Sequence, residues 1–184
     1  MRNEEKLIII TGPSGVGKGT VVKEVLRKNT KFWLSISATT RKARQGEIHG
    51  KQYYFLGKNK FQEMIRDDLF LEWAEFAGNY YGTPLESVSS KIESGHIVIL
   101  EIEVEGARQI KEKFPNSLSI FLLPPSMKEL ENRIRNRGTD NEDSITRRLD
   151  RSKFEISCSK EFDFTITNED LQKTINSVYQ IIVS

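Results

Sequence analysis

The sequence predicts an α/β fold in which a parallel β-sheet is covered by helices on both faces. Short apolar runs typical of buried strands occur at residues 7–10, 97–100, 118–123 and 162–166. Patterns typical of amphipathic helices occur between and after them, at residues 21–26, 104–114, 127–137 and 171–182. Strands that alternate with helices indicate parallel connections, and these predict a three-layer architecture.

A glycine-rich loop follows the first of these strands. Its sequence is Gly12-Pro13-Ser14-Gly15-Val16-Gly17-Lys18, and a helical pattern begins shortly after it. Glycines let consecutive backbone N–H groups surround an anion, and the helix directs its positive dipole end at the same place. A strand, a loop of this spacing and a helix form the context of a phosphate-binding P-loop. We therefore expect this segment to bind the phosphates of a nucleoside triphosphate.

The residue after the lysine departs from the usual P-loop pattern. Most such loops have Ser or Thr there, and its hydroxyl binds Mg²⁺. This chain instead has Gly19, followed by Thr20. Loops that end in Gly-Lys-Gly-Thr resemble those of adenylate kinases and of some other nucleoside monophosphate kinases. We expect phosphate binding to be unaffected, with Mg²⁺ held mainly by phosphates and water.

The composition argues against several classes of function. The 28 basic and 26 acidic residues nearly balance, so neither a nucleic-acid surface nor a membrane-binding patch is expected. The single cysteine, Cys158, cannot form an intramolecular disulfide, and no Cys/His cluster indicates a zinc site. The apolar runs are too short to span a bilayer, and the charged N-terminus lacks a signal-peptide core. We expect a soluble cytoplasmic protein, either a monomer or a homodimer.

Residues 37–86 interrupt the alternation of strands and helices. They are rich in Arg, Glu, Tyr and Gly, and their aromatic runs at 53–55 and 70–76 suit small antiparallel strands. A helical piece near residues 61–65 lies between those runs. These features predict an inserted lobe of mixed α/β structure.

Residues 133–149 form a second interruption, which is rich in arginine. Within it, Thr139-Asp140-Asn141-Glu142 has the form of a capping box, so we expect a new helix to start here. A charged segment between two helices and next to a nucleotide site is a candidate lid.

The inserted lobe carries side chains suited to a second nucleotide. Arg41 and Arg44 lie on one loop, where two guanidinium groups can grip a phosphate, and Glu47 can hold one of them in place. Glu72 lies in an apolar strand, where burying a carboxylate without a partner is costly. Guanine supplies that partner, because its N1–H and 2-amino group are adjacent donors that one carboxylate can accept. The lobe therefore indicates a guanine nucleotide.

Together these motifs resemble guanylate kinase over essentially the whole chain. The shared features are the glycine loop, residues 37–47, the strand with Glu72, and the segments 78–83, 100–103, 137–138 and 168. The resemblance implies one domain, residues 1–184, with a five-stranded core built from residues 4–36, 87–132 and 150–184. It also implies a GMP-binding lobe at 37–86 and a helical lid at 133–149. The implied activity is the ATP-dependent phosphorylation of GMP, and of dGMP, to GDP, with Mg²⁺ as cofactor.

The resemblance also implies roles for individual residues. Those for ATP are Gly12, Pro13, Ser14, Gly15, Val16, Gly17, Lys18, Gly19, Thr20, Arg133, Arg137 and Asn168. Those for GMP are Ser37, Arg41, Arg44, Glu47, Tyr53, Glu72, Tyr81, Gly82, Thr83, Glu101 and Glu103. Those that assist phosphoryl transfer are Lys18, Arg41, Arg137 and Arg148. Glu101 and Glu103 stand where the family usually has aspartates, and Glu101 is the carboxylate expected near Mg²⁺. Glu105 replaces a glutamine often found at that position.

Three alternatives to a GMP kinase have to be weighed against the same residues. An AMP kinase is disfavoured by Glu72, because a carboxylate would repel the acceptor at N1 of adenine. A catalytically inactive, guanylate-kinase-like binding domain is disfavoured by the presence of Lys18 and the lid arginines, and by the lack of room for a further module. A general ATPase would not explain the side chains of the inserted lobe, such as Glu72 and Tyr81.

Replacing Glu72 with Gln should weaken the use of GMP by roughly ten- to a hundred-fold, because the guanine donors would face a mismatched partner. The measurement is steady-state kcat/KM for GMP, with the KM for ATP as internal control. IMP lacks the 2-amino group and should be a poor substrate of the wild type. Unchanged GMP turnover in Glu72→Gln would contradict the assignment of guanine to this lobe.

Overall fold

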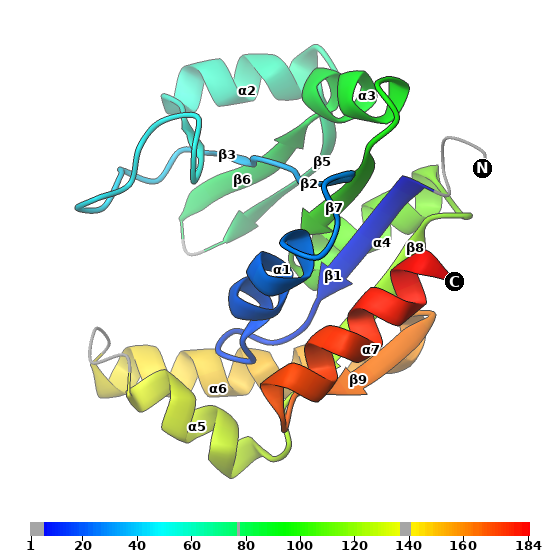
Figure 1. Ribbon diagram of the computed structural model, residues 1–184. Coiled ribbons are helices and arrows are strands. Elements are labelled where there is room, and N and C mark those ends of the chain that lie inside the picture. The colour runs from blue at the N-terminus through cyan, green and yellow to red at the C-terminus, as the bar shows by residue number, and fades with distance from the viewer. Residues whose placement is uncertain (1–5, 77, 137–140) are drawn as a thin grey trace.

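A five-stranded parallel sheet forms the centre of the structure (Figure 1). The computed structural model describes residues 6–76, 78–136 and 141–184. The strand order is β2-β7-β1-β8-β9, and every neighbouring pair is parallel. The strands are β1 (Leu7–Thr11), β2 (Phe32–Leu34), β7 (Ile97–Glu101), β8 (Leu118–Leu123) and β9 (Phe164–Thr167). The predicted α/β fold with a five-stranded parallel sheet is confirmed.

Helices cover both faces of this sheet. Along β1, Ile8 and Ile10 face the cluster formed with α1 (Lys18–Leu26) and α7 (Leu171–Val183). Leu7 and Ile9 face the opposite cluster, formed with α4 (Val104–Lys113). Side chains alternate between the two faces of a strand, so one central strand contributes to two cores. All five residues of β1 are buried, as expected for a parallel strand covered on both sides.

Among the strands and α-helices of the core, the edge strand β2 and the helix α3 (Leu85–Glu93) have no counterpart in the predicted elements. β2 has three residues, which is too short for a periodic pattern. In α3 the only fully buried residue is Val88, so its apolar face is narrow. In both cases packing against the sheet, rather than local pattern, decides the conformation.

A second, four-stranded sheet is built from residues between 38 and 84, in the order β4-β3-β6-β5. Its strands are β3 (Ala38–Thr39), β4 (Tyr54–Phe55), β5 (Phe70–Phe76) and β6 (Asn79–Pro84). The helix α2 (Lys58–Arg66) covers it through the fully buried Phe61, whose ring stacks 4.4 Å from Phe70 and 5.5 Å from Tyr80. This sheet therefore has an aromatic core of its own.

One predicted strand pairing is wrong. The aromatic run at residues 53–55 is predicted to form an antiparallel strand, but β4 pairs with β3 in parallel. The loop between them, residues 40–53, is long enough to carry the chain back to its starting side, which parallel pairing requires. The antiparallel pairing predicted for residues 70–76 is confirmed, because β5 pairs with β6.

The helices α5 (Met127–Arg135) and α6 (Glu142–Ser157) form a pair packed through Leu130, Ile134 and Ile145. In Figure 1 this pair and the four-stranded sheet lie on opposite sides of α1. The helix predicted to start near residue 139 is present, and the Asn141 side chain caps it by accepting from the Ser144 N–H. Thr139, the first residue of the predicted capping box, lies outside the described residues.

The chain ends with the short 3-10 helix η2 (Ser159–Glu161), the strand β9 and the helix α7. Across the described ranges, no helix combines the length and the hydropathy that crossing a membrane requires.

Replacing Phe61 with Ala should lower the free energy of unfolding by about 3 to 5 kcal/mol, because the substitution leaves a cavity in the aromatic core of the lobe. Urea denaturation followed by circular dichroism measures the loss. The control is Phe164→Ala, since the Phe164 side chain is 43% exposed and should cost about 1 kcal/mol or less. Equal losses in the two variants would contradict this view of the lobe.

Candidate active site

The glycine-rich loop connects β1 directly to α1. Gly12, Gly15 and Gly17 have φ angles of +146°, +93° and +101°, in the region that favours glycine. Gly17 is the N-cap residue of α1, so the loop ends at the positive pole of the helix dipole. A Cβ atom at Gly12 would overlap the carbonyl oxygen of Leu122, so the loop lies against β8 without room for a side chain. The local geometry is that of an anion-binding loop.

Cationic side chains of α1 and α6 contact this loop. Lys18 is 9% exposed, its ammonium donates to the Gly12 carbonyl oxygen, and it lies 3.9 Å from a carboxylate oxygen of Glu103. From α6, Arg148 donates a 2.8 Å hydrogen bond to the Ser14 hydroxyl. The candidate lid helix therefore contacts the loop directly in this structure.

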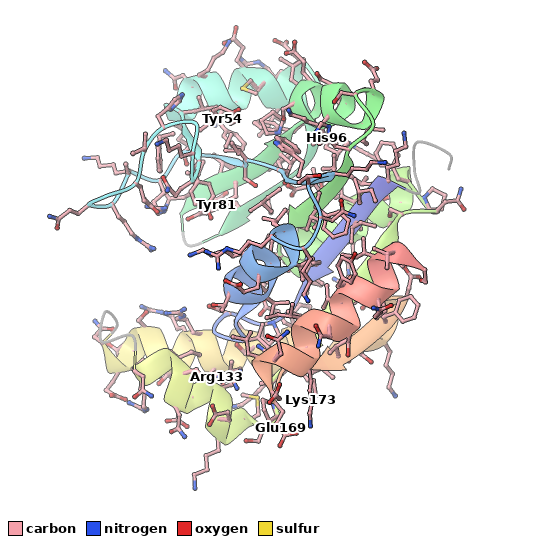
Figure 2. The ribbon with its side chains drawn as sticks, viewed as in Figure 1. Tyr54, Tyr81, His96, Arg133, Glu169 and Lys173 are labelled. Carbon is pink, nitrogen blue, oxygen red and sulfur yellow. The ribbon has the colours of Figure 1, made fainter. Side chains whose placement is uncertain are left out.

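Arg133 and Asn168 support the loop through its backbone. Arg133 donates to the carbonyl oxygens of Val16 at 3.2 Å and of Asn168 at 3.1 Å. The Asn168 side chain is buried and donates to the same Val16 oxygen at 2.8 Å. Figure 2 shows Arg133 on one side of α1 and Tyr81, a residue of the lobe, on the other. These contacts hold the loop in place, and the prediction that both residues bind ATP stays a prediction.

Two cavities meet at the loop. One, of about 550 Å³, is lined by the loop and the start of α1, including Lys18, Gly19 and Thr20. The other, of about 370 Å³, lies under the lobe and is lined by every residue predicted for GMP except Thr83. Both cavities include Ser14, Glu101 and Glu103 in their walls. A ligand on the loop would therefore lie next to a ligand under the lobe.

Arg41 lines the lobe cavity and is held in place by Glu47. Its guanidinium forms two hydrogen bonds with the Glu47 carboxylate, of 2.9 and 2.8 Å, and lies 5.5 Å from the centre of the Tyr53 ring. The hydrogen bond to Glu47 raises the pKa of Arg41, and the same contact lowers the pKa of Glu47. The Tyr53 and Tyr81 rings lie 6.1 Å apart, edge to face. A cation fixed beside tyrosine side chains is suited to binding a phosphate.

Glu72 is the buried carboxylate of the lobe cavity, with 5% of its surface exposed. One of its oxygens accepts a 2.6 Å hydrogen bond from the Thr83 hydroxyl. The other packs on the backbone of α4 at Gly106, where a Cβ atom would overlap it. Burial raises the pKa of Glu72 to about 7, the Thr83 hydrogen bonds oppose this, and Glu103 and Lys113 act in opposite directions. Thr83 is itself fully buried, so it influences the cavity through Glu72.

Glu101 is the carboxylate best placed for a divalent cation beside the loop. Its oxygens lie 3.5 and 3.7 Å from where a Cβ atom of Gly19 would be. Burial raises the pKa of Glu101, nearby Lys18 lowers it, and Glu103 raises it further. Among the described residues no cluster of three or more His, Cys, Asp or Glu side chains could hold a metal. A hard cation with one or two carboxylate neighbours and otherwise phosphate and water ligands fits this arrangement.

Arg151 lines the lobe cavity and was not among the predicted site residues. It is paired with Glu105 of α4 and with Glu155, whose oxygen lies 3.2 Å from the arginine Nε. Burial raises the pKa of Glu155, which is 1% exposed. The spacing of three residues between Arg148 and Arg151 places both on one face of a helix, and this spacing could have identified Arg151.

Gly106 is a second residue of the site that the sequence prediction missed. A single glycine inside a helical pattern often marks a close approach of another group, and here that group is Glu72. Arg137, which was predicted to assist catalysis, lies outside the described residues.

Comparison with known proteins identifies the family. A model of the family described as guanylate kinase matches residues 4–184. The chain belongs to the guanylate kinase family. The guanylate kinase of Prochlorococcus marinus subsp. pastoris is 64% identical over 184 residues, which is 100% of both chains. That of a Nostoc strain is 55% identical over 173 residues, covering 94% of this chain and 87% of the relative.

Solved structures agree with this assignment. The crystal structure of guanylate kinase from Anaplasma phagocytophilum matches with a TM-score of 0.78 at 31% identity, covering 96% of this chain and 84% of that one. A shikimate kinase from Bacteroides thetaiotaomicron, at 13% identity and a TM-score of 0.53, shares the fold alone. Guanylate kinases phosphorylate GMP to GDP with ATP. The predictions of family, fold class and kinase activity are confirmed.

If Glu72 binds guanine as the sequence predicts, the KM for GMP should fall by about ten-fold between pH 6 and pH 8, because the base would need the ionised carboxylate, whose pKa is raised to about 7. Below that pKa the carboxyl carries a proton and cannot accept from both guanine donors. Steady-state kinetics at saturating ATP measure the profile. GMP itself titrates near ~6, so the matched control is Glu72→Gln, which keeps that titration. Identical profiles in the two proteins would contradict the prediction.

Proposed function

We propose that the loop cavity holds ATP, that the lobe cavity holds GMP, and that the phosphoryl group crosses where the two cavities share walls. The observation that supports this most directly is the common lining by Ser14, Glu101 and Glu103. Two nucleotides bound in adjoining cavities would have their phosphates close together. Residues 37–86 would then be the GMP-binding lobe and residues 133–149 the lid.

In this proposal the base of GMP is recognised by polar side chains that line or adjoin the lobe cavity. Glu72 accepts from N1–H and the 2-amino group, the Thr83 hydroxyl donates to one of the Glu72 oxygens, and Ser37 contacts the base edge. The GMP phosphate lies near Arg41, where Arg44, Tyr53 and Tyr81 complete its surroundings. We expect dGMP to be accepted as well.

Phosphoryl transfer needs placement and charge more than proton transfer. An oxygen of the GMP phosphate attacks the γ-phosphorus of ATP, a new P–O bond forms, and the bond to the β,γ-bridging oxygen breaks to release ADP. That phosphate is already mostly ionised at neutral pH, with a second pKa near ~6, so no general base is required. Lys18, Arg41 and Arg148 offset the repulsion between the two polyanions. Arg137 is proposed to join them.

Guanylate kinases typically need Mg²⁺, and the residues beside the loop fit that requirement. Glu101 would lie nearest the cation, with Thr20 close by on α1. The cation would supply positive charge to the ATP phosphates. Glu103, which lies 3.9 Å from Lys18, keeps the lysine ammonium directed toward the shared wall.

Water must be kept from the γ-phosphate, or ATP would be hydrolysed without GMP. The lobe and the α5–α6 pair lie on opposite sides of the loop. We propose that they approach each other when both nucleotides are bound. The contact of Arg148 with Ser14 supports this, because it already joins α6 to the loop.

The test is a coupled assay for ADP release with and without GMP. The wild type should release ADP only when GMP is present. Lys18→Met should lower kcat by about a hundred-fold or more, because the positive charge that stabilises the migrating phosphoryl group is lost. Lys28→Met is the control, since Lys28 is exposed just beyond the C-terminal end of α1 and donates a hydrogen bond to Asn176. ADP release without GMP would instead indicate an ATPase. No release with both substrates would indicate a binding domain.

A further inference from the structure

The lobe strand β5 lies at one edge of its sheet, and its outer edge faces the helix α4 of the core. In the order β4-β3-β6-β5, the described strand beside β5 is β6. An edge strand presents N–H and C=O groups that need partners from elsewhere. At this edge the partners are side chains of α4.

Gln109 of α4 provides the contacts that a neighbouring strand would provide. Its Oε1 accepts a 3.2 Å hydrogen bond from the Trp73 N–H, and its Nε2 donates a 2.7 Å hydrogen bond to the Trp73 carbonyl oxygen. A side-chain amide carries a donor and an acceptor side by side, as a strand edge requires. Gln109 therefore clamps the backbone of the residue that directly follows Glu72.

The same face of α4 makes two further contacts with β5. Gly106, Gln109 and Lys113 follow the spacing i, i+3 and i+7, which places them on one side of a helix. Gly106 leaves the space that the Glu72 carboxyl fills, and Lys113 donates a 3.1 Å hydrogen bond to the Leu71 carbonyl oxygen. Three consecutive residues of β5 thus each meet one residue of α4.

We propose that Gln109 is a positioning residue for guanine recognition, which fixes the Glu72 carboxylate against Gly106 by clamping the Trp73 backbone. This inference rests on the proposed role of Glu72. Hydrogen bonds weaken steeply when their geometry is distorted. A small shift of β5 would therefore weaken the hydrogen bonds between the Glu72 carboxylate and guanine. The clamp itself is partly open to solvent, and such bonds add little to folding stability. Its loss therefore affects recognition more than folding.

Gln109→Met removes both hydrogen bonds to the Trp73 backbone. Met has a side chain of similar length and is also a good helix former. We expect kcat/KM for GMP to fall about ten-fold, mainly through KM. The kcat/KM for IMP should fall less, because IMP lacks the 2-amino donor. The ratio of kcat/KM for GMP to that for IMP should therefore fall. The KM for ATP should not change. The matched control is Arg108→Met on the neighbouring position, where the arginine pairs with Glu161 and lies near Cys158 and Phe154.

The ratio of kcat/KM for GMP and IMP decides the outcome. A lower ratio in Gln109→Met, with wild-type values in Arg108→Met, supports the inference. A wild-type ratio together with a lower thermal midpoint would mean that the clamp only stabilises the fold, and would overturn the inference while the proposed function stands. No preference for GMP over IMP in the wild type would overturn the proposed function, and with it the inference.

A second variant covers the case in which Gln109→Met does not fold. Gln109→Glu keeps an acceptor for the Trp73 N–H but places a carboxylate against the Trp73 carbonyl oxygen. The GMP-to-IMP ratio should therefore fall in this variant too. An unchanged ratio would overturn the inference.

Discussion

The contact between β5 and α4 is the constraint that fixes the position of Glu72 in the lobe cavity. β5 belongs to the sheet of the lobe, yet Leu71 packs into the core beneath the parallel sheet. The next residue, Glu72, faces the lobe cavity from the same strand. Because side chains alternate along a strand, one residue of β5 can anchor the lobe to the core while the next lines the lobe cavity. The glycine at position 106 permits this approach.

Several cations of the site lie beside carboxylates. Arg41 pairs with Glu47, Lys18 lies near Glu103, and Arg151 pairs with Glu105. Such pairs contribute little to stability when they are partly exposed, but they fix long side chains in one orientation. Fixed cations lose less conformational entropy when a phosphate arrives, and this favours binding in a defined position.

Much of this architecture could be read from local patterns, and the exceptions share a physical reason. The P-loop, four of the core strands and the lobe strand β5 each carry their own periodicity or spacing. β2 and α3 do not, because their conformation depends on packing against distant residues. The parallel pairing of β4 depends on the path of a long loop. Gln109 has ordinary helical surroundings in the sequence, and only its contacts with the Trp73 backbone place it near the site.

The sequence by itself predicted the two kinds of ligand. A glycine loop between strand and helix binds phosphates through its own backbone, and a carboxylate in an apolar strand needs a partner with adjacent donors. Both are local properties of the chain. The tertiary structure alone decided that the two cavities share a wall at Ser14, Glu101 and Glu103, and that Glu72 rests on Gly106 and beside the Gln109 clamp. These contacts join residues far apart in the chain, and long-range packing rather than local propensity sets them.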